Sequence, residues 1–451
     1  MKANFTPGAD IAVFMLLAAG GAVAYLAGRR RWSPPLWAAV LVGLGLRLAV
    51  LAAAHGLRPY DLVNDFHLAG VNVLHHQDPL LHTRATGWNY LPLYAFVLAA
   101  EVKLGAVFHI PWAYMGRAFP ILADLGIILL VGVIAGKRSG PLRRFQYACY
   151  PLAVIVSAVH GQIEPTCLML ALGSLAIVLT RGSPIATARD ETSLSRRWRD
   201  KLSVPAAGVL LGLAVGAKTW PVLFVPALWR ALPSARERAR CMLAAGGVVA
   251  ALFVTMPWTV GTPAGDLVKD AKLIATYHPE VGTWGWSAII SHLYRVPLGS
   301  HRAAVIGWTA SGITLAAVII AVWWWRRSHP VDLATAAPGA FLVTTASFGP
   351  QYLMWPAATL IARPTRRCGW FHVTACAWVF SDEVGISGFT WREHLALLPY
   401  LKLASILVIF AIAAALPWER RRGGVPPDGT PATGLTAPQA AGPEPQPVPG
   451  S

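Results

Sequence analysis

A long series of apolar runs constrains this chain more than any other feature of the sequence. A helix that crosses a bilayer needs roughly 20 mostly apolar residues. Mean hydropathy is +0.51 and only 13% of residues are charged, well below the quarter that is usual in soluble domains. About 13 spans are predicted, in one membrane domain over 1–422. They lie near 9–28, 35–54, 113–135, 145–160, 164–180, 203–217, 219–230, 241–257, 303–325, 331–347, 351–362, 370–381 and 396–416.

Two segments of the chain depart from this pattern. The run 91–108 contains Glu101 and Lys103, which are expensive at the centre of a bilayer, so we expect a surface or re-entrant helix there. It belongs to a long polar loop, 55–112, which follows the second span. Residues 423–451 are rich in proline, glycine and alanine and cannot bury a core, so a disordered cytoplasmic tail is predicted.

Basic clusters give a prediction of orientation. Lysine and arginine favour the cytoplasmic ends of spans. One alternating topology, with the N-terminus outside and 91–108 not crossing, places every basic cluster on that side: 29–31, 137–144, 181–201, 230–240, 326–327, 363–367 and 420–422. The opposite, outer face then holds the loops 55–112, 258–302 and 382–395 and the turns 160–165 and 348–352, where we expect the active site.

Charge and cysteine content exclude other classes. The net charge of +17 lies in short loops between spans, where it orients helices and meets anionic lipid, so no nucleic-acid partner is expected. The five cysteines lie mostly in apolar runs without a close pair, which predicts neither disulfides nor a zinc site. Seven histidines fall on the outer side. The adjacent pair His75-His76 has no carboxylate at ligand spacing, so neither a metal nor another cofactor is expected.

Four polar segments lie on the predicted outer face, each beside proline or glycine at the end of a helix. They are VNDFHLAG at 63–70 with WNYLPLY at 88–94, HGQIEP at 160–165, GLAVGAKTWPVLFVPALW at 212–229 and FGPQYLMWP at 348–356. Their order and sidedness resemble the GT-C superfamily of integral-membrane glycosyltransferases. The resemblance is to polyprenyl-phosphate-mannose-dependent mannosyltransferases and glycosyltransferase family 87, and it runs from about residue 55 to 360.

The resemblance implies a GT-C-like bundle of transmembrane helices in a bacterial plasma membrane. The implied reaction transfers a sugar, mannose, from a polyprenyl-phosphate donor to a hydroxyl of a glycolipid, glycan or protein acceptor. The paired aspartates of the family motif stand here as Asp61 and Asp65, with three residues between them, and its double proline is Leu91-Pro92. Either aspartate is a candidate for the catalytic base, with Asp65 preferred.

Sugar transfer needs a base near the acceptor oxygen and cations or donors near the departing phosphate. Lys218, beside a break at Trp220-Pro221, either binds the lipid phosphate or extends to the membrane surface. Gln162 and Glu164 either bind sugar hydroxyls or cap the following span. Asp65 is a base, a helix cap or a solvated loop charge. The other candidates for substrate binding are Asn64, Trp88, Tyr90, Gln351 and Tyr352. A transporter or flippase of lipid-linked sugars is the alternative function, and it predicts polar groups distributed toward both faces.

Overall fold

The protein is all-helical throughout the part of the chain that the structure describes. The computed structural model describes residues 8–54, 56–57, 59–83, 88, 90–181, 193–276, 281–297, 299–384 and 391–420, with backbone alone over 193–201 and 391–396. The predicted tail, 423–451, and parts of the predicted outer loops (84–87, 277–280 and 385–390) lie outside these ranges.

The helical elements follow one another with short connections. The first half contains α1 (Ala9–Arg29), α2 (Leu36–Ala53), η1 (Asp61–Phe66), α3 (His67–Leu74), α4 (Pro79–His82), α5 (Leu93–Val107), α6 (Trp112–Met115), α7 (Ala118–Ala148), α8 (Pro151–Val154), η2 (Ile155–His160), α9 (Glu164–Thr180), α10 (Ser193–Ala217) and η4 (Trp220–Phe224). The second half contains α11 (Val225–Ala231), α12 (Ala235–Val254), α13 (Met256–Thr259), η5 (Ala264–Asp266), α14 (Leu267–Ala275), α15 (Trp286–Tyr294), α16 (His301–Trp325), α17 (Pro330–Thr344), η6 (Pro350–Leu353), α18 (Met354–Ala362), α19 (Cys368–Glu383), α20 (Trp391–Ala415) and η8 (Trp418–Arg420).

Five helices of the described chain are long and apolar enough to cross a membrane: Ala9–Arg29, Leu36–Ala53, Trp112–Ala148, His301–Trp325 and Leu397–Arg420. They match five of the predicted runs, as expected for a multi-pass membrane protein. Inside the third, Gly136 has a φ of 79°, so the helix breaks just before the basic stretch at 137–144, close to where the predicted span ends.

Most of the other predicted runs form shorter helices. α9 has 17 residues and is therefore about 25 Å long, less than the roughly 30 Å of hydrocarbon in a bilayer. The run 351–362 is divided between the 3-10 helix η6 and the 9-residue α18. α5, in the predicted re-entrant segment, has 15 residues, and its Glu101 is buried.

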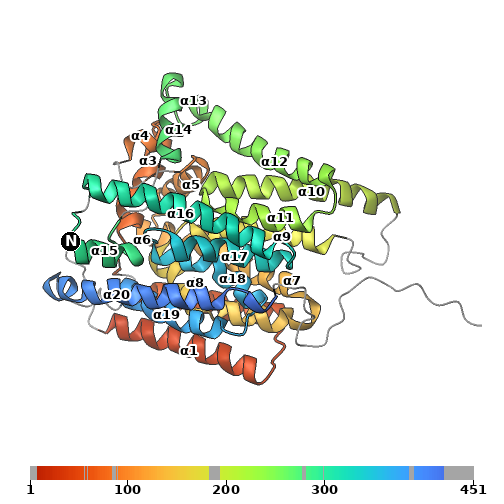
Figure 1. Cartoon of the computed structure of the whole chain (residues 1–451), viewed down its shortest axis with the longest axis horizontal. Helices are drawn as coiled ribbons and strands as arrows, with labels where there is room; N and C mark the ends of the chain where they lie inside the picture. The colour runs from red at the N-terminus through yellow and green to blue at the C-terminus, as the bar shows by residue number, and fades with distance from the viewer. Residues whose placement is uncertain are drawn as a thin grey trace, which may run out of the picture.

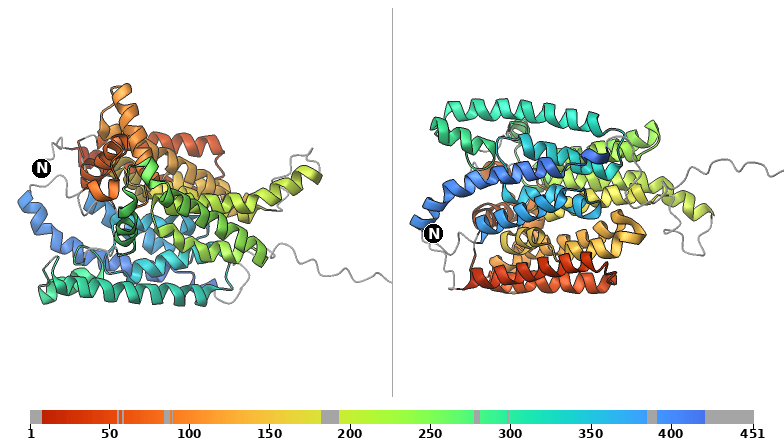
Figure 2. Two further views of the ribbon diagram at one scale, coloured as in Figure 1. Left: turned by 90° about the horizontal axis from the view of Figure 1, so that it is seen from above. Right: turned by 60° about the horizontal axis from the view of Figure 1, so that its bottom comes forward.

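The long helices share one general direction, and several of the short helices lie toward one end of the molecule. In Figure 1, α1, α16 and α20 lie along the horizontal axis, whereas α3, α4, α13, α14 and α15 lie toward the left; Figure 2 shows the same arrangement from two further sides. The basic clusters meet in ion pairs elsewhere: Arg363 and Arg420 both bind Asp332, and Arg181 binds Glu237. Basic segments that were predicted to lie on one side of the membrane are therefore neighbours in the structure.

A closed polar network lies in the core between α2, α7 and η2. Arg47 and Asp124 form a fully buried ion pair at 2.7 Å, and the hydroxyls of Tyr147 and Ser157 both donate to the Asp124 carboxylate. Arg47 also donates to the carbonyls of Gly43 and Ala148. Because the two charges face each other inside the bundle, this pair joins helices and is not turned toward a ligand.

Candidate functional site

The polar turn 160–165 is the centre of the candidate site, and its shape depends on glycine. Gly161 has a φ of 69°, a left-handed conformation that glycine adopts without steric cost. It ends η2 and allows the chain to turn into α9 within a few residues. A Cβ at this position would lie 2.9 Å from Cγ of Arg117.

Arg117 holds this turn against two other segments. It is 1% exposed, and its guanidinium donates to the carbonyls of Leu57, Ala113 and Val159. The loop after α2, the short helix α6 and the end of η2 are thereby fixed to one side chain. These contacts place Arg117 in support of the site.

A chain of polar side chains begins at Asp61. Gln162 Nε2 donates to Asp61 Oδ2 at 2.7 Å and lies 2.7 Å from Nε2 of His160. His160 Nδ1 lies 2.9 Å from Oε1 of Glu383, at the end of α19. Burial disfavours the charge of His160, but Glu383 and Asp61 outweigh it and raise the pKa of His160 to about 10. At pH 7 the ring is therefore a cation, with Nδ1–H directed at Glu383.

Asp65 lies in the same helical run as Asp61 but has different surroundings. Its side chain is 7% exposed, and no hydrogen bond or ion pair reaches it from the described residues. Burial, followed by the negative charge of Asp61, raises the pKa of Asp65 to about 6. Burial also acts on Asp61, but His160, Gln162 and Lys218 outweigh it and lower the pKa of that carboxyl.

Lys218 lies in a cage of aromatic rings. α10 ends at Ala217, as the motif around Pro221 predicts, and Nζ of Lys218 reaches Oε1 of Glu164 at 2.5 Å. The same ammonium lies 4.9 Å from the ring centres of both Tyr90 and Tyr352. Burial disfavours its charge, but Glu164 and the two tyrosines raise the pKa of Lys218 well above its usual value.

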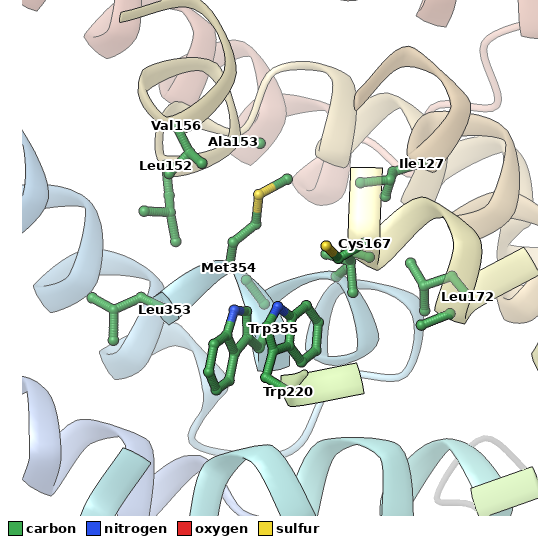
Figure 3. Close-up of a cluster of buried hydrophobic side chains, with 14 of the residues drawn as sticks. Ile127, Leu152, Ala153, Val156, Cys167, Leu172, Trp220, Leu353, Met354 and Trp355 are labelled. Carbon is green, nitrogen blue, oxygen red and sulfur yellow. The ribbon is translucent and has the colours of Figure 1, made fainter. Parts of the chain in front are cut away.

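A cavity of about 340 Å³ opens beside Lys218. Its walls come from η4, α14, α16, α17 and α18, and they include the stacked indoles of Trp220 and Trp355, whose ring centres are 4.3 Å apart. Figure 3 shows these two indoles against each other, with Cys167 and Met354 nearby. Their Nε1 atoms are buried and have no hydrogen-bond partner among the described residues.

The structure decides between several alternatives that the sequence left open. Asp65 is inside a continuous helical run and is buried, so it is neither a cap nor a solvated charge. Lys218 is 4% exposed and paired, so it does not extend to the membrane surface. α9 has Ile163 at its N-cap position and no side-chain cap. Gln162 instead binds Asp61, and Glu164 binds Lys218.

The remaining residues predicted to bind substrate are Asn64, Trp88 and Gln351. Asn64 donates to the carbonyl of Tyr60 and has no contact with the polar chain that begins at Asp61. Trp88 is buried; its indole N–H donates to the carbonyl of Tyr90, which fixes the segment that carries the Tyr90 ring. Gln351 is buried beside Tyr352, and its Oε1 has no partner in the described chain.

Three contributors were missed by sequence reasoning. His160 was counted only among the histidines of the outer face, Glu383 was not singled out, and Trp355 appeared only within a motif string. Glu383 and His160 are 223 positions apart in the sequence, and no sequence pattern links them. The aromatic-proline composition of 348–356 was the available signal for Trp355.

Among the described residues, no group of three or more histidine, cysteine, aspartate or glutamate side chains is placed to hold a metal ion. Comparison with protein-family models and with curated proteins gives no match. The site's residues alone therefore carry the functional argument.

Proposed function

We propose that the protein transfers a sugar, mannose, from a polyprenyl-phosphate donor to an acceptor hydroxyl at the outer face of a bacterial plasma membrane. The observation that carries this proposal is the cavity beside Lys218. Lys218 lies at one end of it, close enough to Asp61 to lower the pKa of that carboxyl, and the rest of its lining is mostly apolar. The GT-C-like resemblance of the motifs supplies the donor class.

The cavity suits a phosphate attached to a long apolar chain. A lysine ammonium has three N–H donors, and one is directed at Glu164, which leaves two for a phosphate. The indole rings of Trp220 and Trp355 form part of the wall of the same cavity. Leu315 of α16 lines the cavity and is 63% exposed, so an isoprenoid chain can leave along this helix into lipid.

The aspartates suit the chemistry at the acceptor. In an inverting displacement the acceptor oxygen bonds to the anomeric carbon, the bond from that carbon to the phosphate oxygen breaks, and the hydroxyl proton passes to a base. With a pKa of about 6, Asp65 is mostly ionised at pH 7 and accepts that proton. Asp61 is 37% exposed and bound to Gln162, so it is placed to orient a sugar hydroxyl.

The test is transfer from labelled polyprenyl-phosphate-mannose by the purified protein in nanodiscs, with membrane extract as the acceptor source. Asp65→Asn should lower the rate by about 10²–10⁴-fold, the usual contribution of a positioned base. Glu237→Gln is the matched control, because this carboxylate pairs with Arg181 beyond the far end of α9 and should leave the rate unchanged.

Two outcomes would contradict the proposal. Full transfer by Asp65→Asn would remove Asp65 from the reaction, and Asp61→Asn would then be the next variant. Movement of the labelled lipid between leaflets without any transfer would support the transporter or flippase instead.

A further inference from the structure

A second cavity, of about 440 Å³, shares no lining residue with the cavity beside Lys218. It is formed by the start of α3, the end of α5 and the 108–115 segment. Its polar lining consists of Glu101, His67 and His109, and its apolar lining includes Trp112 and Met115. A cavity with mostly apolar walls and a few polar groups is the usual form of a small-molecule site.

Glu101 is the residue of this lining whose hydrogen bonding is incomplete. It is 5% exposed; Oε1 accepts a hydrogen bond from the backbone N–H of Phe119 at 3.0 Å, and Oε2 is buried without a partner in the described chain. Leaving a buried polar atom unpaired costs about 1–3 kcal/mol. A bound hydroxyl would remove that cost.

The protonation states of Glu101 and His67 indicate which class of ligand the cavity binds. Burial raises the pKa of Glu101 to about 8, although the Phe119 N–H opposes this, and burial lowers the pKa of His67. At pH 7 Glu101 is therefore mostly a neutral acid and His67 a neutral imidazole. Among the described residues that line the cavity there is no lysine, arginine or aspartate. A neutral group rich in hydroxyls fits this lining better than an anion does.

The Trp112 ring and the exposed apolar residues beside the cavity indicate more closely which hydroxyl-rich ligand fits. The Trp112 ring is held in place because its indole N–H donates to the carbonyl of Leu62 at 2.8 Å, and it lies 5.0 Å from the His67 ring. A fixed indole offers a flat apolar surface for one face of a sugar ring. Val107 and Phe108, next to the cavity's lining residues, are 61% and 64% exposed, so an attached alkyl chain would meet an apolar surface.

We propose that this cavity binds the neutral sugar headgroup of a glycolipid, with Trp112 against the ring and Glu101, His67 and His109 at its hydroxyls. His67 follows Asp65 by two residues in one helical run, and Trp112 binds Leu62 between the two aspartates. The cavity is therefore joined directly to the segment that carries the base. Its role as the acceptor site rests on the proposed function, whereas sugar binding does not.

Binding can be measured without any transfer reaction. Dicyclohexylcarbodiimide reacts with protonated, apolar-buried carboxyls: the acid O–H adds across the carbodiimide, and an acyl shift leaves a stable N-acylurea. On the full chain in nanodiscs, the rate of this modification at Glu101 is followed by peptide mass spectrometry. Octyl α-mannoside at ten times its dissociation constant should slow the modification by about tenfold, by mass action.

Three controls decide the result. Triethylene glycol monooctyl ether, which has the chain without the sugar, should not protect Glu101, and methyl α-mannoside should protect only at much higher concentration. His67→Ala retains the reactive Glu101 and should weaken protection by octyl mannoside. Glu101→Gln keeps an oxygen for the Phe119 N–H and should abolish the adduct on its peptide.

Each contrary result has a defined meaning. An unchanged modification rate with octyl mannoside, or equal protection by the sugar-free ether, would overturn the proposal. Equal protection by methyl mannoside would show a site for free sugars and overturn the glycolipid assignment. Protection by octyl mannoside in a protein that transfers no sugar would support this site and contradict the proposed function.

Discussion

Asp65 combines burial with the lack of a partner, and both properties suit a base. Because burial and the charge of Asp61 raise its pKa to about 6, the ionised, active form is lost as pH falls through that value. We expect kcat/KM to fall about tenfold for each pH unit below this midpoint and to level off above it. Measuring transfer between pH 4.5 and 8 checks this.

The effect of Asp61 on that midpoint is a separate prediction. Removing its negative charge in Asp61→Asn should leave the burial of Asp65 in place but lower the pKa of Asp65, so the residual activity should persist to lower pH. The acid limbs of the two proteins are compared in the same nanodisc assay. An acid limb at the same pH in both would show that Asp61 does not act on the titrating group.

Lys218 and Glu164 must be changed together to separate binding from folding. Lys218→Met alone leaves a buried carboxylate without its cation, which typically costs about 3–5 kcal/mol. Lys218→Met with Glu164→Gln should regain most of that stability but keep a raised KM for the donor, because the phosphate has lost its ammonium. Thermal unfolding and donor kinetics are measured on both variants. Normal donor KM in the double variant would limit Lys218 to a structural role.

At the scale of residues, the sequence predicts which side chains belong to the site better than it predicts which side chains they bind. Asp61, Gln162, Glu164 and Lys218 are visible as polar residues beside proline or glycine in apolar surroundings. Their pairing is not, since Gln162 meets Asp61 across 101 positions and Lys218 meets Glu164 across 54. Such contacts depend on how the helices pack, and hydropathy contains no information on that.

At the scale of elements, the turn at Gly161 is where local conformation controls the site. Gly161→Ala places a methyl group 2.9 Å from Arg117 in a left-handed backbone, and the conformation alone costs about 1–2 kcal/mol. We expect lower thermal stability and reduced transfer, because His160 and Gln162 flank this residue. Both are measured on the purified variant.

Gly246→Ala is the matched control for that turn. Gly246 lies in the middle of α12, and a Cβ there would meet no atom within 4 Å. Alanine in a helix interior is favoured over glycine by about 0.5–1 kcal/mol, so this variant should be as stable as the parent or slightly more so. Gly161→Ala with the stability and activity of Gly246→Ala would show that the turn tolerates a side chain.

The long helices could be predicted from hydropathy, and the broken ones could not. Each of the five helices long enough to span coincides with an apolar run, because length and composition are sufficient there. The runs 219–230 and 351–362 are also apolar, yet prolines and packing divide them into 3-10 and short α-helical pieces. Trp220, Tyr352 and Trp355 lie on these broken helices, and Lys218 lies just before the first of them, so the least predictable elements build the cavity.

At the scale of the whole molecule, the arrangement of charged ends predicts a topology. The basic clusters meet around Asp332 and Glu237, whereas α14 lies with the short helices toward the opposite end of the long axis (Figure 1). Positive charge favours the cytoplasmic side, so α14 should face outward and the start of α12 inward.

This topology can be tested with cysteines at two exposed positions, Val268→Cys in α14 and Arg236→Cys in α12. In a background with Cys368 and Cys376 changed to alanine, an impermeant maleimide should label Val268→Cys in intact cells. It should label Arg236→Cys only after the membrane is opened. Labelling of Arg236→Cys alone in intact cells would invert the topology and place the cavity beside Lys218 on the cytoplasmic side.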